Sequence, residues 1–335
     1  MLTMRNEHDT PETLLEAVKY YAEFEHCKAV MIEARWPDGI VRCPTCGSDH
    51  VRYMANTRRW KCYGKHPRPQ FSLKVGTIFE DSPIPLEKWL PAVWLLLNCK
   101  NGISSYEIAR DLGVTQKTAW FMLHRIRKAM QAGTFMKLDG EVEVDETFIG
   151  GKARNMHVAQ RERRITGTGG KDKTAVMGIV KRGGEVRTAV IPDRKKRTLH
   201  AHVEANVQAG AALYSDDLRS YDGLAGRYAH QVVDHAVEYV RGNVHTNTLE
   251  NFWALLKRGI HGTYVSVEPY HLHRYLDEQT FRYNQRKLDD GGRFRLALSQ
   301  IVGKRLMYDE LIGKAAMEKQ RQEFSEEIQA RKANN

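Results

Sequence analysis

The chain has 335 residues, 41% of them hydrophobic, with a formal net charge of +11 and a sequence pI near 9.3. This length and composition exclude a mostly disordered chain and predict two or three folded modules. The basic surplus favours a polyanionic partner, most often nucleic acid, although a merely basic protein is the alternative.

Targeting, membrane and disulfide signals are weak in this sequence. The N-terminus is polar, and the longest apolar run, WLPAVWLLL at 89–97, is too short to cross a bilayer. Three of the five cysteines cluster, which indicates metal binding in a reducing compartment rather than a disulfide framework. We therefore expect a cytoplasmic protein without a membrane partner.

The first predicted module is an N-terminal helical segment at residues 1–40. One helix is expected from residue 10 to about 34, since Thr10 can cap it, Pro11 suits its first position and apolar residues recur at roughly helical spacing.

A cysteine-rich module follows at residues 41–80. Cys43 and Cys46 form a Cys-x2-Cys turn. Cys62 and His66 form a second pair, with three residues between them. Structural zinc is held by four sulfur or nitrogen ligands, so these residues predict a Cys3His site for one Zn²⁺. His50 is a weaker candidate for the fourth ligand, and turn cysteines without metal are the alternative.

Residues 83–132 are predicted to be helical and to include a helix-turn-helix. Ser104 and Glu107 form a capping box for one short helix, Gly113 ends it, and Thr115 caps the next. The second helix of such a motif enters the major groove of DNA. A helical hairpin packed on its neighbours is the alternative. The expected DNA contacts are Gln116, Lys117, His124, Arg125, Arg127 and Lys128.

From residue 138 to 290 the pattern changes to strands and helices. Expected strands are EVEVDETF, a hairpin that turns at Gly183-Gly184, AALYSDD and QVVDH, with helices near 198–209, around Glu250 and near 269–285. The fold class is therefore multi-domain: a small zinc ribbon and a helical part, then an α/β mixed-sheet domain. Residues 291–335 are predicted to be a charged C-terminal tail.

Three acids in the last domain suggest a metal site. Asp145 and Asp216 lie in predicted strands, and Glu250 lies on a predicted helix with Lys257 two turns further along the same face. Mg²⁺ prefers carboxylate oxygens, and two such ions can drive displacement at phosphorus. Singly, each acid has another explanation: a solvated strand face, a turn, or a capping box between Asn247 and Glu250.

Other basic residues could contact a DNA backbone. Lys257 is placed to hold a phosphate beside the metals, and Arg258 less directly. The glycine-rich insertion at 150–173 resembles a mobile polycationic loop, with a solvated loop as the alternative. Its expected DNA contacts are Arg161, Arg163 and Arg164.

Taken together, the motifs CPTCGS, KCYGKH, VDETFIGGK, YSDDLRSYDGL, VHTNTLENFWALLKRGIHGTY and HLHRYLDEQTFRYNQR resemble the DDE transposases of bacterial insertion sequences. The group concerned carries a zinc ribbon before its catalytic domain, and the resemblance covers roughly residues 40–287. It implies an RNase-H-like catalytic domain, two Mg²⁺ or Mn²⁺ ions, and cleavage and transfer at terminal inverted repeats.

By motif position, the resemblance implies that Asp145, Asp216 and Glu250 form the catalytic triad and that Lys257 is the basic residue after it. Some relatives have an Asn at the third position, so Asn247 competes with Glu250. The ribbon's usual fourth cysteine is absent, so His66 is the inferred replacement.

The sequence thus predicts a metal-dependent DNA transposase. Its partners would be the double-stranded inverted repeats and target DNA, and it would act as a dimer or larger assembly because two ends must be joined. Two alternatives stay open: an RNase-H-like nuclease without strand transfer, and a DNA-binding regulator that has lost catalysis.

Overall fold

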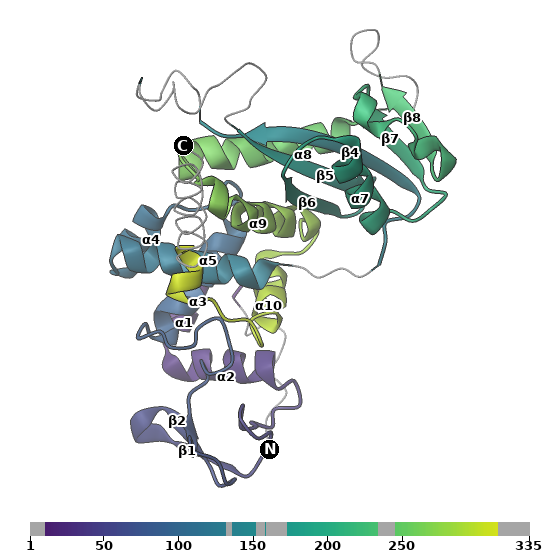
Figure 1. Cartoon of the computed structure of the whole chain (residues 1–335). Helices are drawn as coiled ribbons and strands as arrows, with labels where there is room; N and C mark the ends of the chain where they lie inside the picture. The colour runs from purple at the N-terminus through teal and green to yellow at the C-terminus, as the bar shows by residue number, and fades with distance from the viewer. Residues whose placement is uncertain (1–10, 132–135, 152–157, 159–172, 234–244, 314–335) are drawn as a thin grey trace, which may run out of the picture. The chain divides into compact units, whose positions relative to one another are not determined.

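The computed structural model describes residues 11–131, 136–151, 158, 173–233 and 245–313. Two compact units make up the chain, drawn together in Figure 1. The first joins residues Met1–Leu96, Ser105–Ala129 and Phe294–Asn335, and the second joins Leu97–Ser104 and Met130–Arg293. No helix in these described stretches is both long and apolar enough to span a membrane.

The first unit begins with two helices, α1 (Leu14–Tyr21) and α2 (Phe24–Arg35), where the sequence predicts one. Thr13, not Thr10, caps α1, because its hydroxyl accepts the Glu16 N–H while the Glu16 carboxylate accepts the Thr13 N–H. Glu23 has an extended backbone, which separates the two helices. The single long helix is therefore wrong, although the helical character of the segment holds.

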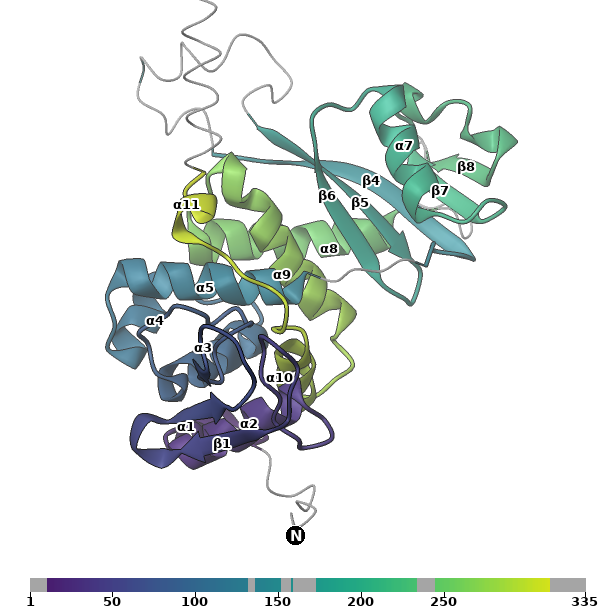
Figure 2. The same cartoon turned by 60° about the horizontal axis from the view of Figure 1, so that its bottom comes forward.

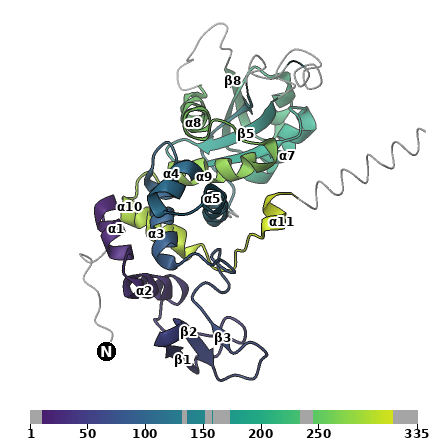
Figure 3. The same ribbon diagram turned by 90° about the vertical axis from the view of Figure 1, so that its left-hand side faces the viewer.

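The ribbon that follows is a small antiparallel sheet, shown in Figure 3 with its three strands side by side. Its strands pair in the order β1-β2-β3. Trp60 and Phe71 are buried and stack on one another across β2 and β3. A core of this size is too small to hold a fold without a cross-link. The strands are β1 (Val51–Met54), β2 (Arg59–Cys62) and β3 (Gln70–Phe71).

Three helices come next, α3 (Leu86–Asn98), α4 (Ser105–Leu112) and α5 (Gln116–Met130). Gly113 ends α4 with a φ of +59°, and the Thr115 hydroxyl accepts the Thr118 N–H at the start of α5. The predicted boundaries of both short helices are thus confirmed. From Met122 to Arg127 every residue of α5 is buried, so the middle of this helix lies inside the unit.

The C-terminal part of the first unit is packed, contrary to prediction. α10 (Asp290–Ser299) and α11 (Tyr308–Leu311) are connected by a segment with buried Ile301 and Leu306. The Phe294 ring packs against the rings of Tyr21 and Trp94. The predicted charged tail is wrong for residues 291–313, where a few well-spaced apolar side chains suffice to anchor the segment. Residues 314–335 lie outside the described part.

The second unit is built on a five-stranded mixed sheet, with strand order β6-β5-β4-β7-β8. β4, β5 and β6 are antiparallel neighbours, whereas β4, β7 and β8 run parallel. Gly183 turns the predicted hairpin with a φ of +68°. This topology is consistent with the expected RNase-H-like domain. The strands are β4 (Glu141–Ile149), β5 (Thr174–Lys181), β6 (Val186–Ile191), β7 (Ala212–Asp216) and β8 (Ala229–Val233).

Helices cover both faces of this sheet, as Figure 2 shows for α7 and α8. α7 (Lys196–Asn206) buries one core with Val142 and Val144 of β4. α8 (Asn247–Arg258) and α9 (Leu272–Asn284) bury the other core, which includes Val176 and Val180 of β5. α8 continues into a π-helical turn, η6 (Gly259–Tyr264). Strand β4 therefore runs between two cores, and its side chains alternate between them.

Candidate metal centres

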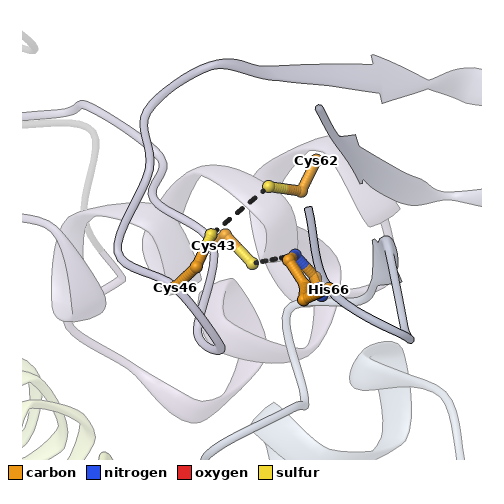
Figure 4. Close-up of side chains that lie close together, drawn as sticks. All are labelled: Cys43, Cys46, Cys62 and His66. Atoms are coloured by element: carbon orange, nitrogen blue, oxygen red, sulfur yellow. Dashed lines mark hydrogen bonds between the residues drawn. The ribbon is translucent and has the colours of Figure 1, made fainter. Parts of the chain in front are cut away.

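The first candidate centre lies in the ribbon, where the predicted Cys3His residues meet. Cys43 and Cys46 come from the turn before β1, Cys62 ends β2, and His66 follows in the next turn. Figure 4 shows the four side chains pointing toward one another. One ligand atom from each lies within 4.8 Å of the others.

The spacing of these atoms fits one zinc ion. Cys46 and Cys62 place their sulfurs 3.6 Å apart, and the Cys43 sulfur lies 3.4 Å from His66 Nε2. A tetrahedral ion with zinc–sulfur bonds of about 2.3 Å separates its ligands by roughly 3.7 Å. Gly64 permits this approach, because a Cβ there would be 3.1 Å from the Cys46 sulfur.

Local backbone groups favour a thiolate in this cluster. Burial opposes ionisation of Cys43, but the N–H groups of Cys46 and Thr45 outweigh it and lower the pKa of Cys43 to about 7. The rival ligand His50 instead stacks on the Tyr63 ring, 4.8 Å between centroids, and is not in the cluster. Cys27 lies outside the cluster, where it is fully buried and donates to the Tyr21 carbonyl.

The second candidate centre lies in the middle of β4, beside the C-terminal end of β7. The parallel register pairs Glu141 with Ala212 and Glu143 with Tyr214. Asp145 and Asp216 come two residues later on their strands, so the same register brings them face to face. The Asp216 carboxylate also accepts the Leu218 N–H at 3.2 Å, which fixes it in a turn. Two aspartates predicted from sequence are thus neighbours in space.

A third acid in this group was missed by the sequence analysis. One carboxylate oxygen each from Asp145, Glu146 and Asp216 lies within 4.8 Å of the others. Glu146 is also held by a hydrogen bond from the Tyr221 hydroxyl. Strand alternation argues against grouping neighbouring residues, because it sends their side chains to opposite faces. The two acids are grouped where the pairing of β4 with β7 stops, because β7 ends at Asp216 beside them.

These acids suppress one another's ionisation. Burial, and then the charge of Asp216, raise the pKa of Asp145 to about 6, against hydrogen bonds from Trp253 and the Glu146 N–H. Burial likewise raises the pKa of Glu146 to about 7, with Asp216 and Asp145 adding to it and Tyr221 opposing it. Such a site favours a cation that offsets the repulsion.

Helix α8 carries the other predicted site residues. Among the described residues, Glu250 is not in the close carboxylate group, but its charge contributes to the raised pKa of Asp145. Asn247 is the exposed first residue of α8, and Lys257 is partly exposed in its last turn. The alternative capping box is not found, because Thr246 is the N-cap and its side chain makes no capping bond.

The start of α8 is instead held by Glu143, which follows Val142 in β4. Glu143 is fully buried. Its carboxylate accepts the N–H groups of Thr248 and Leu249 at 3.0 and 3.1 Å, and the Thr248 hydroxyl at 2.9 Å. Arg182 neutralises it, with 2.8 Å between Nε and Oε1. This clamp fixes the helix that carries Glu250 to the strand that carries Asp145.

The predicted DNA-contacting residues differ in how exposed they are. Lys117 is exposed, while the Gln116 amide bonds to the Ser105 hydroxyl. Arg258 is exposed at the end of α8. Arg161, Arg163 and Arg164 lie outside the described residues.

A surface role for His124, Arg125 and Arg127 is wrong in this structure. All three are buried, and the Arg125 guanidinium donates to the carbonyls of Ile78 and Glu80. Lys128 stays partly exposed and is bonded to the Arg305 carbonyl and to the Glu310 carboxylate. The other three side chains are buried because α5 is central to the unit.

Two protein-family models match this chain, one over the ribbon and one over the mixed-sheet domain. Residues 25–64 match a transposase zinc-ribbon domain, and residues 137–284 match an ISXO2-like transposase domain. The first range includes all three cysteines of the cluster and ends two residues before His66. The second range contains the close carboxylate group and most of the helices around it.

Two similar proteins are also named for transposable elements or transposases. An uncharacterized protein in the transposable element ISH50 of Halobacterium salinarum is 27% identical over 252 residues, 72% of this chain and 84% of its own length. An uncharacterized transposase-like protein of Haemophilus influenzae is 27% identical over 105 residues, 31% of this chain and 85% of its own length. The chain thus matches a transposase zinc-ribbon domain followed by a transposase domain, the order that its resemblance to zinc-ribbon-bearing transposases predicts.

Proposed function

We propose that the protein is a DNA transposase that cleaves the terminal inverted repeats of an insertion sequence and transfers the 3′-hydroxyl ends to target DNA. The observation that carries this proposal is the meeting of Asp145, in the middle of β4, with Asp216, at the end of the parallel strand β7, with Glu146 beside them. Mg²⁺ or Mn²⁺ fits this site, since the donors are hard carboxylate oxygens whose pKa values are raised by burial and then by neighbouring negative charges.

Two divalent ions held here would supply Lewis acidity at the attacking and leaving oxygens of a phosphodiester. The task of the protein is to hold and orient the reacting groups. Asp145 presents its oxygens from the middle of β4 and Asp216 from the end of β7, and Glu143 fixes α8 against β4. Catalysis would then rest on prior positioning of charge rather than on movement during the reaction.

α8 supplies the third catalytic ligand in this proposal. Glu250 is the better candidate, because a carboxylate neutralises a divalent ion and its charge already reaches Asp145. Asn247, at the exposed start of the helix, is the rival. Lys257 lies two helical turns beyond Glu250 on α8, where it would hold a DNA phosphate. Arg258 would contribute less directly.

DNA binding is assigned to the first unit as well. The zinc ribbon, ordered by one Zn²⁺ at Cys43, Cys46, Cys62 and His66, and the first turn of α5, with Lys117 exposed, would contact the element's ends. Because two ends must be joined, we expect a dimer or larger assembly on DNA.

A strand-transfer assay tests the proposal. Duplexes with the inverted repeats that flank the protein's own coding sequence are incubated with supercoiled plasmid and Mg²⁺ or Mn²⁺. The expected result is cleaved ends joined to plasmid. Nicked plasmid without joined product would overturn strand transfer and leave the nuclease alternative. No metal-dependent cleavage at all would favour a DNA-binding regulator.

Paired variants in the same assay decide the third ligand. We expect Glu250→Gln to lose cleavage and Asn247→Ala to retain most of it. Loss in Asn247→Ala with survival of Glu250→Gln would reverse the assignment. Ala254→Gly, one turn beyond Glu250 on α8 and exposed, controls for damage to the helix itself.

A further inference from the structure

The indole of Trp253 makes a direct contact with the acidic site. Trp253 lies on α8 three residues after Glu250 and is 4% exposed. Its Nε1–H donates a hydrogen bond to Asp145 Oδ2, with 2.9 Å between the two atoms. The other oxygen of Asp145, Oδ1, accepts the Glu146 N–H at 2.8 Å. The carboxylate of Asp145 is thereby held at both oxygens, each of which retains a lone pair for a cation.

Gly178 creates the space for this indole. It stands opposite Asp145 in the β4–β5 register. A Cβ at Gly178 would lie 2.5 Å from the Trp253 ring atom Cζ2 and 2.9 Å from Leu249 Cδ2, too close for any side chain. A glycine inside a strand commonly marks such a close approach. The ring therefore lies against the backbone of β5 on the strand position beside Asp145.

We propose that Trp253 is a positioning residue that fixes the rotation of the Asp145 carboxylate for divalent-cation binding, with Gly178 as the seat of its ring. The inference rests on the proposed function, since it assigns a role to a partner of that site. Hydrogen-bond donors that orient metal ligands typically change metal affinity or activity 10- to 100-fold when they are removed.

Burial alone would give Trp253 a different role. It belongs to the core between α8 and the sheet, with Phe252 and Leu256 nearby. If packing were its sole contribution, a ring of similar shape without the N–H would serve equally well. Trp253→Phe makes this change, because phenylalanine keeps an aromatic ring against Gly178 and removes the donor.

The test is a Mn²⁺ titration of cleavage rate for Trp253→Phe. We expect the half-saturating Mn²⁺ concentration to rise by about 10-fold, with most of the rate recovered at saturation. Trp89→Phe is the matched control, because Trp89 is equally buried and its indole donates to the Ser82 hydroxyl in the other unit. An unchanged half-saturating Mn²⁺ concentration in Trp253→Phe, with or without a lower rate at saturation, would overturn the positioning role.

A second measurement needs no variant at position 253. The six tryptophans give six indole N–H signals in a ¹⁵N-labelled protein. We expect Mg²⁺ to shift one of them in the wild type and none in Asp145→Asn. Mg²⁺ binding without any indole shift would contradict the contact. Wild-type protein that neither binds Mg²⁺ nor cleaves DNA would instead contradict the proposed function, so the two failures are distinguishable.

Discussion

The cysteine cluster and the carboxylate group both gather ligand atoms within 4.8 Å, but by opposite physical means. The ribbon's four ligands are complete, and their spacing matches one tetrahedral ion. The three acids repel one another, and burial deepens the cost of charging them. The ribbon cluster would therefore stabilise the fold once zinc is bound. The acidic group lowers the stability of the metal-free fold, as expected for a catalytic site.

Removing zinc gives the largest expected effect. Structural zinc contributes on the order of 10 kcal/mol to the folding of small modules, and the ribbon's own core is minimal. We expect a chelator to abolish hydrogen-exchange protection in β1 and β2. His66→Ala should weaken zinc retention strongly, while His50→Ala should leave it intact because His50 only stacks on Tyr63. Equal loss in both histidine variants would break the assignment of the fourth ligand.

The Asp216→Asn variant should show the opposite stability effect. Loss of a metal ligand is expected to reduce cleavage at least about a thousandfold, equivalent to ~4 kcal/mol. Without metal, however, the variant should melt at a higher temperature than the wild type, because one repelling charge is gone. Asp217→Asn changes the adjacent exposed acid and should do neither. A less stable metal-free Asp216→Asn would contradict the account of the site.

Glu143 sharpens the comparison, because it is an acid on the same strand as Asp145 but has a structural role. Its buried carboxylate holds the start of α8 and pairs with Arg182. Breaking such a pair costs about 3 kcal/mol or more. We expect Glu143→Gln to lower the free energy of unfolding by that amount in denaturant titrations. Glu141→Gln, on the exposed start of β4, should change it by under about 1 kcal/mol. Similar losses of stability in both variants would contradict the proposed structural role of Glu143.

The pH dependence of the metal-free protein separates the acidic site from the rest. Asp145 and Glu146 have pKa values near 6 and 7 in the fold, above their unfolded values of about 4. The folded state binds more protons between these limits, so these two groups lower stability as the pH rises from 4 to 7. The share of Asp145 should be on the order of 3 kcal/mol, measured as the change with pH in the stability of the wild type relative to Asp145→Asn. A wild type that gains stability over Asp145→Asn as the pH rises would contradict this sign.

Much of the fold could be predicted from local pattern. Alternation in EVEVDETF, the Gly183-Gly184 turn and the capped helices around Gly113 all lie where the sequence placed them. Strand order, and the register that aligns Asp145 with Asp216, depend on pairing between distant segments, which no local pattern encodes. The cysteine spacing sufficed for the ribbon cluster because its ligands sit on turns close in sequence.

The errors have a common cause, because burial of charged side chains cannot be read from local pattern. Arg125 and Arg127 look like phosphate contacts on a basic helix, but α5 is central and buries them. Glu143 looks solvated by alternation, but α8 covers that face. Glu146 joins the site where the pairing of β4 with β7 stops, and Trp253 joins it through the close approach at Gly178.

The most direct test of the contrast between the two centres is a metal inventory of wild type and Asp145→Asn. Zinc is counted by elemental analysis, and Mn²⁺ binding is followed by electron paramagnetic resonance. The account predicts one zinc in each protein and Mn²⁺ binding in the wild type that is lost in Asp145→Asn. Equal Mn²⁺ binding by both proteins would contradict the assignment of the acidic group as the catalytic metal site.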